Sequence, residues 1–199
     1  MTVQQLVDAC HDLAAAGLSP GSSGNASIRD GDRILITPTG TALRRVTADD
    51  IAELTLDGAL VSGPPPTKEW AMHLAAYRAR PDAEAVIHLH SPAATAVSCL
   101  PHADGADPLP AYTPYRIRML GRVGLVGYQP PGSDGLAERV GAAAATSACL
   151  LLAHHGSLVC GPDLLRAVDL AEELEAAAAL TLALGGRGAG ELNRDTAWG

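Results

Sequence analysis

The chain has 199 residues, of which 47 % are hydrophobic and 18 % are charged, and its formal net charge is −8 at pH 7. This composition excludes extensive disorder, and the acidic excess argues against nonspecific binding to nucleic acid or to an anionic membrane. The sequence has neither an apolar run of the roughly 18 residues that a membrane helix needs nor a basic start followed by an apolar stretch, so we expect a cytoplasmic protein.

The first third of the chain is predicted to be rich in hairpins. Apolar residues at helical spacing are followed by Gly17, a common helix stop. Asp30 and Gly31 separate two short apolar runs, which is typical of a hairpin turn. In chain order, the expected elements are a helix over 3–16, strands over 25–29 and 33–37, a short helix from Thr47 through Leu54, and a hairpin over 55–62 that turns at Asp57-Gly58.

Helices and strands alternate in the rest of the chain. Ser91 and Pro92 are suited to be the N-cap and the first residue of a helix. The expected elements are a helix over 67–81, a strand over 85–90, a helix over 91–100, a loop over 101–110, strands near 115–120 and 122–128, a helix over 133–147, strands over 149–153 and 157–160, and a helix over 162–184. The Gly-rich residues 185–199 are expected to form a loose tail.

These elements predict a single α/β domain over residues 1–199, in which a mainly antiparallel sheet is flanked by helices. The sequence contains neither G-x-G-x-x-G nor a P-loop string, so a Rossmann-type fold is not expected. The cysteines are scattered singly, and in a cytoplasmic protein we expect them to be reduced and to pack as small buried apolar residues. They are Cys10, Cys99, Cys149 and Cys160.

Histidines in two distant stretches are candidates for a metal site. His88 and His90 are two residues apart on a predicted strand, so both imidazoles point to the same face and can converge on one ion. His154, His155 and Gly156 end another apolar run. Because neighbouring side chains on a strand point in opposite directions, at most one of this second pair can join the first. Gly156 indicates a tight bend where backbone segments come close.

A carboxylate opens the helix expected from Thr67. Glu69 in a first helical turn is explained either by the helix dipole or by a role as a metal-bound or metal-adjacent general base. His73 follows four residues later on the same face, where packing or hydrogen bonding is the favoured interpretation.

Three segments offer the groups that bind an anion. Residues 22–25 and 37–40 supply hydroxyls and flexible backbone beside predicted strands, and residues 67–68 supply a hydroxyl, a cation and free N–H groups at a helix start. Each segment alone is ordinary turn chemistry. Together with a metal site they indicate a phosphorylated substrate.

In combination, five strings resemble the class II aldolase/adducin family, in the family's order from Gly17 to Gly161. They are G-L-S-P-G-S-S-G-N-A-S-I-R, I-L-I-T-P-T-G, P-T-K-E-W-A-M-H, R-P-D-A-E-A-V-I-H-L-H-S and H-H-G-S-L-V-C-G. The resemblance implies the class II aldolase fold and one divalent metal per subunit, usually Zn²⁺, with Mn²⁺ or Co²⁺ as alternatives. It also implies a homotetramer with active sites at subunit interfaces.

The resemblance also implies roles for individual residues. His88, His90 and His155 match the family's metal ligands, whereas His154 stands where relatives often have Asn and is left out. Glu69 matches the catalytic acid/base, which can also ligate the metal. The residues that match phosphate-binding positions are Ser22, Gly24, Asn25, Thr39, Gly40, Thr67 and Lys68.

Two departures from the aldolase pattern bear on the reaction. Many aldolases have Ser-Ser-Glu where this chain has Thr67-Lys68-Glu69, and the Lys variant is similar to the branch of 3-oxo-tetronate 4-phosphate decarboxylases. No tyrosine follows Tyr128, so the family's C-terminal tyrosine has no counterpart. Tyr115 falls near the family's other catalytic tyrosine, which reaches a neighbouring subunit; otherwise it is a strand aromatic.

The resemblance therefore implies a metal-dependent carbon–carbon lyase that acts through a metal-bound enediolate on a small phosphorylated sugar or sugar acid. The favoured reaction is decarboxylation of a 3-oxo-tetronate 4-phosphate to dihydroxyacetone phosphate and CO₂. The alternative is cleavage of a ketose 1-phosphate, as in L-fuculose-1-phosphate aldolase, and epimerase and dehydratase branches share the metal site. A non-enzymatic adducin-like binding module is a remote alternative, because such relatives lack the metal histidines.

Overall fold

The computed structural model describes residues 1–102 and 107–193. Within them, one eight-stranded sheet runs in the order β4-β3-β2-β1-β5-β8-β7-β6. Every neighbouring pair is antiparallel except β6 and β7, which are parallel. The strands are β1 Asn25–Asp30, β2 Arg33–Ile36, β3 Ala52–Thr55, β4 Leu60–Ser62, β5 Ala85–Leu89, β6 Val123–Val126, β7 Cys149–Leu152 and β8 Gly156–Gly161. The prediction of a mainly antiparallel sheet flanked by helices is confirmed.

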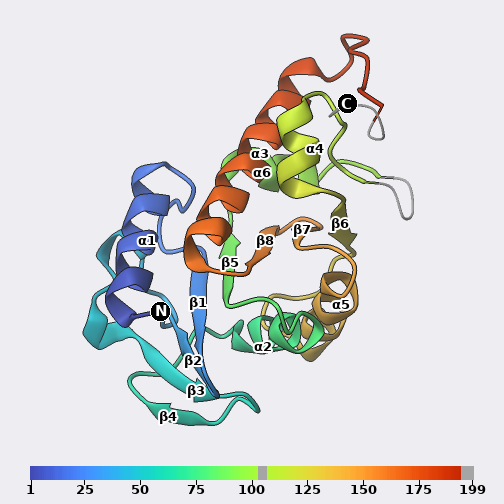
Figure 1. Ribbon diagram of the computed structural model, residues 1–199. Helices are drawn as coiled ribbons and strands as arrows, with labels where there is room; N and C mark the ends of the chain where they lie inside the picture. The colour runs from blue at the N-terminus through green and yellow to red at the C-terminus, as the bar shows by residue number, and fades with distance from the viewer. Residues whose placement is uncertain (103–106, 194–199) are drawn as a thin grey trace.

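Helices cover both faces of this sheet (Figure 1). Their bounds are α1 Val3–Ala15, α2 Trp70–Ala79, α3 Pro92–Ser98, α4 Pro114–Leu120, α5 Asp134–Ala144 and α6 Leu164–Leu184. The helices α1, α3 and α6 pack on one face, and α2 and α5 pack on the other. Among the described helices, none combines the length and the apolar character needed to cross a membrane.

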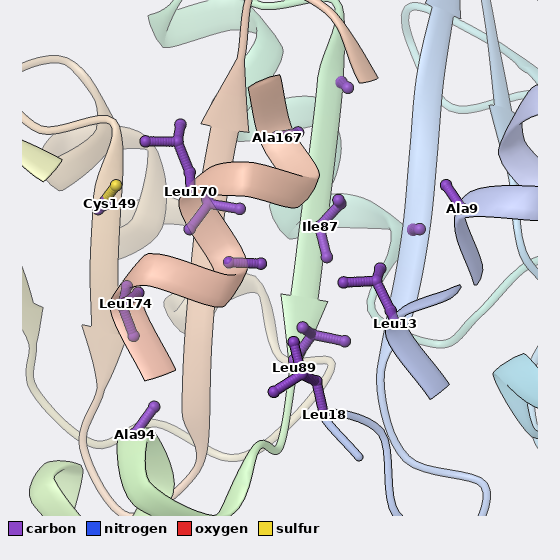
Figure 2. Packing of buried hydrophobic residues seen from close by; sticks show 14 of the residues in the cluster. Ala9, Leu13, Leu18, Ile87, Leu89, Ala94, Cys149, Ala167, Leu170 and Leu174 are labelled. Atoms are coloured by element: carbon purple, nitrogen blue, oxygen red, sulfur yellow. The ribbon is translucent and has the colours of Figure 1, made fainter. Parts of the chain in front are cut away.

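Side chains of β5 alternate between two apolar clusters, as expected for a strand covered on both faces. Ile87 and Leu89 belong to the cluster under α1, α3 and α6, which we call the α6-side cluster. Figure 2 shows these two residues near Leu13 and Leu18, and Leu170 and Leu174 of α6 belong to the same cluster. Val86 belongs to the α2-side cluster, so the next side chain on that face, His88, points toward α2.

Strand direction brings four distant segments to one edge of the sheet. β5 and β7 run parallel to each other because both are antiparallel to β8. β1 is also antiparallel to β5, and its first residue, Asn25, is paired with His88. The carboxyl ends of β5 and β7 and the starts of β1 and β8 therefore meet at the same edge, which we call the site edge.

Two of the expected elements are wrong. Residues 115–120 form helix α4 rather than a strand, because Thr113 caps the helix by accepting from the Arg116 amide and Pro114 occupies the first turn. The buried Arg116 guanidinium then binds Asp107 at 2.5 Å. The helix expected through Leu54 ends after one 3₁₀ turn, Ala48–Asp50, and β3 begins at Ala52.

Ser91 and Pro92 are the N-cap and the first residue of α3, as predicted, whereas the expectation that all four cysteines are buried is wrong for Cys99. The Ser91 side chain makes no capping bond to α3. Instead, the Glu175 carboxylate of α6 accepts from the amides of Ala93 and Ala94, both at 2.8 Å. Cys99 is exposed, whereas the other three cysteines are buried and all four are free thiols. In the segment expected to be a loose tail, Leu192 donates its amide to the carbonyl of Ala111; residues 194–199 lie outside the described residues.

Candidate metal centre

One acidic and three imidazole side chains converge at the site edge. The potential ligand atoms of Glu69, His88, His90 and His155 all lie within 4.8 Å of one another. The three imidazole rings form a nearly symmetrical triangle, with every pair of ring centroids 4.8 Å apart. The structure thus brings together the four residues that the sequence singled out as metal ligands.

The carboxylate reaches the imidazoles from the start of α2. Glu69 is the residue just before the helix, a position that the helix dipole favours for a carboxylate, and its side chain makes no capping bond. Its Oε2 lies 3.4 Å from Nε2 of His88, and its Oε1 lies 3.2 Å from Nε2 of His155. The backbone amide of Glu69 donates to the Thr67 hydroxyl, which helps to fix this turn.

The His88 ring is oriented as a metal ligand requires. Nδ1 of His88 donates to the Ser157 carbonyl at 2.7 Å, which leaves the lone pair of Nε2 pointing into the cluster. Nε2 of His90 lies 3.0 Å from this atom. Two nitrogens that each bond one Zn²⁺ ion at about 2.0–2.1 Å lie about 3 Å apart, so this spacing fits a shared cation.

Two buried atoms of the cluster are placed to bind a cation. Glu69 Oε1 and His155 Nε2 are buried and have no hydrogen-bond partner among the described residues. Leaving buried polar atoms unpaired is costly unless another group satisfies them. A divalent cation bound by three neutral imidazoles and one carboxylate would satisfy these atoms, and this donor set suits Zn²⁺.

The protonation states also favour cation binding. Burial lowers the pKa of His88 to about 3, against the opposing charge of Glu69, and burial likewise lowers the pKa of His90. Burial alone would raise the pKa of Glu69, but the close contact with the His155 imidazole, the charge of His88 and the hydrogen bond of Asn25 together hold it well below its usual range. At neutral pH His88 and His90 are therefore neutral and Glu69 is ionised, the forms in which these groups bind metal.

Two glycines let the backbone segments approach at the site edge. A Cβ on Gly156 would lie 2.3 Å from the Leu89 carbonyl oxygen, so only glycine lets β8 start this close to the end of β5. This is the close approach that the sequence indicated at Gly156. Gly24 has a φ of +83°, and a Cβ there would lie 3.0 Å from the His88 carbonyl oxygen.

The three candidate anion-binding segments lie beside the metal cluster. The Thr67 amide donates to the Thr37 carbonyl at 3.0 Å, and Pro38 and Pro66 form an isolated bridge, so residues 37–40 are joined to the start of α2. The segment with Ser22 and Gly24 leads directly into Asn25 and β1. Ser22, Thr39, Gly40 and Lys68 are exposed, and Thr67 is buried. The positive charge of Lys68 contributes to the lowered pKa of His90, which places its field at the cluster.

Two other candidate residues lie outside the group of four. Tyr115 is 56 % exposed on α4, which packs against α6, and its catalytic role stays a prediction. His154 is exposed with a left-handed φ of 56°, and its ring centroid lies 6.3 Å from that of Tyr128.

A comparison with known proteins identifies the family. Residues 4–182 match the family described as Class II Aldolase and Adducin N-terminal domain. The chain belongs to the class II aldolase and adducin family.

Relatives within this family carry two kinds of name. The 3-oxo-tetronate 4-phosphate decarboxylase of Haemophilus influenzae is 41 % identical over 172 residues, which cover 86 % of this chain and 82 % of that protein. The L-fuculose phosphate aldolase of Escherichia coli O6:H1 is 38 % identical over 181 residues, covering 90 % of this chain and 81 % of that protein.

Solved structures in the family share the fold. YgbL from Klebsiella pneumoniae, described as a putative aldolase/epimerase/decarboxylase, superposes with a TM-score of 0.93 at 38 % identity and covers 98 % of this chain and 97 % of its own. An L-fuculose 1-phosphate aldolase superposes with a TM-score of 0.89 at 31 % identity, with coverage of 97 % and 91 %.

The sequence did not predict how Asn25 is used. Its Nδ2 donates to Oε2 of Glu69 at 2.9 Å, and its Oδ1 accepts from Nε2 of His73 at 2.6 Å. Asn25 was expected to bind phosphate, and one hydrogen of Nδ2 is still available for that role. At its other ring nitrogen His73 contacts the Ser27 hydroxyl, which in turn contacts the Tyr77 hydroxyl. The sequence spacing could have indicated this arrangement, because Glu69, His73 and Tyr77 are four residues apart and share one helix face.

Proposed function

We propose that the protein is a metal-dependent carbon–carbon lyase that decarboxylates a 3-oxo-tetronate 4-phosphate to dihydroxyacetone phosphate and CO₂. The observation that carries this proposal is the buried cluster of Glu69, His88, His90 and His155, with its unpartnered oxygen and nitrogen atoms. The resemblance to curated decarboxylases supports the choice of reaction. Zn²⁺ is the proposed metal, because three imidazoles and one carboxylate suit it.

The chain's own residues divide the work of binding the substrate. The three histidines and Glu69 would hold the cation, which when bound supplies a Lewis acid that stabilises negative charge on substrate oxygens. The phosphate is bound by hydroxyl and backbone amide groups. These belong to Ser22, Gly24, Thr39, Gly40 and Thr67. This remote contact positions the reacting carbon beside the cluster, so that binding energy is used for orientation.

Lys68 and Glu69 act at the reacting end of the substrate. The Lys68 ammonium pairs with the carboxylate that will leave as CO₂. When that C–C bond breaks, its electron pair stays on the substrate as an enediolate. The carbon that lost CO₂ then receives a proton that Glu69 has taken up from solvent. Tyr115 of a neighbouring subunit serves as a second acid.

The second candidate is a class II aldolase, which the resemblance to L-fuculose phosphate aldolases favours. A retro-aldol cleavage uses the same site, with Glu69 removing a hydroxyl proton, and leaves the same enediolate. An adducin-like binding module is disfavoured because the three histidines and Glu69 are all in place.

We also propose a cytoplasmic homotetramer with active sites at subunit interfaces. The exposure of Tyr115 on α4, away from the elements that carry the cluster, supports a role for it in a neighbour's site. Light scattering of the purified protein should then give the mass of four chains.

The decisive test is an assay of purified, zinc-loaded protein with 3-oxo-tetronate 4-phosphate and a panel of ketose 1-phosphates. We expect about one metal ion per chain, release of CO₂ and dihydroxyacetone phosphate from the first substrate, and loss of activity after chelation. Release of an aldehyde from a ketose phosphate, with no CO₂ from the acid, would instead identify an aldolase. A metal-free protein would support the binding module.

Lys68→Ser separates the two enzymes further. Because the acid substrate carries an additional negative charge, removal of the ammonium should reduce kcat/KM for the 3-oxo acid about 10-fold or more, as expected for a lost charge-assisted contact. Turnover of a ketose phosphate, which has the phosphate charge but no carboxylate, should change far less. Equal losses for both substrates would contradict the role given to Lys68.

A further inference from the structure

A buried chain of hydrogen bonds extends from Glu69 into the interface between α2 and β1. Glu69, His73 and Tyr77 are four residues apart and share one face of α2. Asn25 and Ser27 are two residues apart and share one face of β1. Except for Glu69, these side chains play no part in the proposed chemistry, and Ser27 and His73 are fully buried.

The donor groups along this series of hydrogen bonds point toward Glu69. The ionised carboxylate of Glu69 can only accept, so the Asn25 atom that faces it at 2.9 Å is the Nδ2 donor. The Asn25 Oδ1 must then face His73, and since an amide oxygen only accepts, the proton of this 2.6 Å bond lies on His73 Nε2. The carboxylate thereby fixes the orientation of the amide and the tautomer of the imidazole.

The same direction of donation holds between Ser27 and His73. With Nε2 protonated, the neutral ring presents the lone pair of Nδ1, which accepts from the Ser27 hydroxyl at 2.8 Å. The Tyr77 hydroxyl donates to the Ser27 carbonyl oxygen at 3.0 Å and also lies 2.9 Å from Ser27 Oγ. From Ser27 through His73 to Asn25, each donor is therefore directed toward Glu69.

This arrangement makes the two oxygens of Glu69 different. Oε2 is held by Asn25, whereas Oε1 has no hydrogen-bond partner among the described residues and lies 3.2 Å from His155 Nε2. An asparagine alone could rotate its amide by half a turn and place Oδ1 against the carboxylate. The His73 N–H opposes that rotation, and the Ser27 hydroxyl supplies a donor for Nδ1 in the tautomer that carries its proton on Nε2.

We propose that His73, Ser27 and Tyr77 are positioning residues that act through Asn25 to hold Glu69 with Oε1 directed into the metal cluster. They touch neither the metal site nor the substrate. The proposal rests on the proposed function for the role of Glu69, but the hydrogen-bond direction that it predicts can be measured without turnover.

The first test is the tautomer of His73 in the zinc-loaded full-length protein, read from the ¹⁵N shifts of its imidazole by NMR. We expect the Nε2–H form for His73 and the Nδ1–H form for His88, which donates to Ser157. A His73 ring protonated at Nδ1 would overturn the proposal, whatever reaction the enzyme catalyses.

The second test compares His73→Leu, which removes the donor, with His73→Gln, which retains an amide N–H near the position of Nε2. Loss of such an outer hydrogen bond typically costs about 10- to 100-fold in activity or metal affinity. We expect His73→Leu to lower kcat by about that factor with a smaller change in KM. We expect His73→Gln to recover most of the loss. Equal impairment of the two variants, or a kcat of His73→Leu close to wild type, would contradict the proposal.

Zinc affinity, measured by competition with a chelator, gives a parallel reading that does not depend on the substrate. We expect His73→Leu to bind zinc more weakly than His73→Gln. If the wild-type protein showed no lyase activity, the proposed function would fail, and this affinity order together with the tautomer would still decide the present inference. Ser27→Ala and Tyr77→Phe should show smaller losses in the same direction. Ser147→Ala, a buried serine outside the chain of hydrogen bonds, should show none.

Discussion

The two faces of β1 show how one strand serves both stability and chemistry. Ala26 and Ile28 point into the α6-side cluster and contribute only apolar surface. Asn25 and Ser27 point the other way, are equally buried, and have hydrogen-bond partners on α2. Burying polar groups is costly unless each is satisfied, so the polar face needs matched partners whereas the apolar face needs only volume. Substitutions on the two faces should therefore fail in different ways.

The largest effect should come from Glu69→Gln, which removes the proton carrier but conserves its shape. General acid–base catalysis is worth about 10²- to 10⁴-fold, and we expect kcat to fall within that range. Circular dichroism and the urea midpoint should change little, because the α6-side cluster is untouched. If Glu69→Gln lost its activity because it unfolded, the polar face would be needed for stability as well, which would contradict the proposed difference between the two faces.

Leu174→Ala should show the opposite pattern. Leu174 is fully buried where α6 packs on the sheet (Figure 2). Truncation of such a side chain costs about 2–5 kcal/mol, which urea unfolding measures directly. The kcat per folded molecule should stay close to that of the wild type. A large loss of kcat at full folding would mean that the α6-side cluster also controls the site.

The smallest effect concerns acid stability. Burial lowers the pKa of His73 to about 4, whereas an unfolded chain has a histidine pKa of about 6.5. Between these values the unfolded chain binds a proton that the folded protein excludes, so the contribution of His73 to stability is complete above about pH 6.5 and decreases as the pH falls toward about 4.

We expect His73→Gln to reduce this acid loss by up to about 3 kcal/mol, measured by urea unfolding of the metal-free protein at pH 7 and near pH 4.5. Glu69 and His88 also titrate in acid, so the difference between the variant and the wild type is the informative quantity. If the stabilities of the variant and the wild type decreased equally with pH, His73 would not be excluding a proton in the folded protein.

Local patterns were sufficient to predict most of the sheet and to single out His88 and His90, whereas the choice of His155 over His154 and the role of Glu69 came from the family resemblance. The alternation of His88 with Ile87 and Leu89 placed that imidazole on a defined face, and Gly156 indicated the close approach that brings His155 near. The wrong strand near 115–120 shows the limit: the buried Arg116, which anchors α4 to Asp107, depends on a partner nine residues away that no periodicity reveals. The role of Asn25 was hidden for a similar reason, because it depends on α2 packing across β1.

Glu175 gives the C-terminal helix a part in the metal centre. By accepting from the first amides of α3, it fixes the start of the helix that follows His90 by only two residues. A chain that ended before residue 175 would leave those two amides without this acceptor. We therefore expect the retention of metal by such a shortened chain to show whether α6, far along the polypeptide, helps to hold the turn that follows His90.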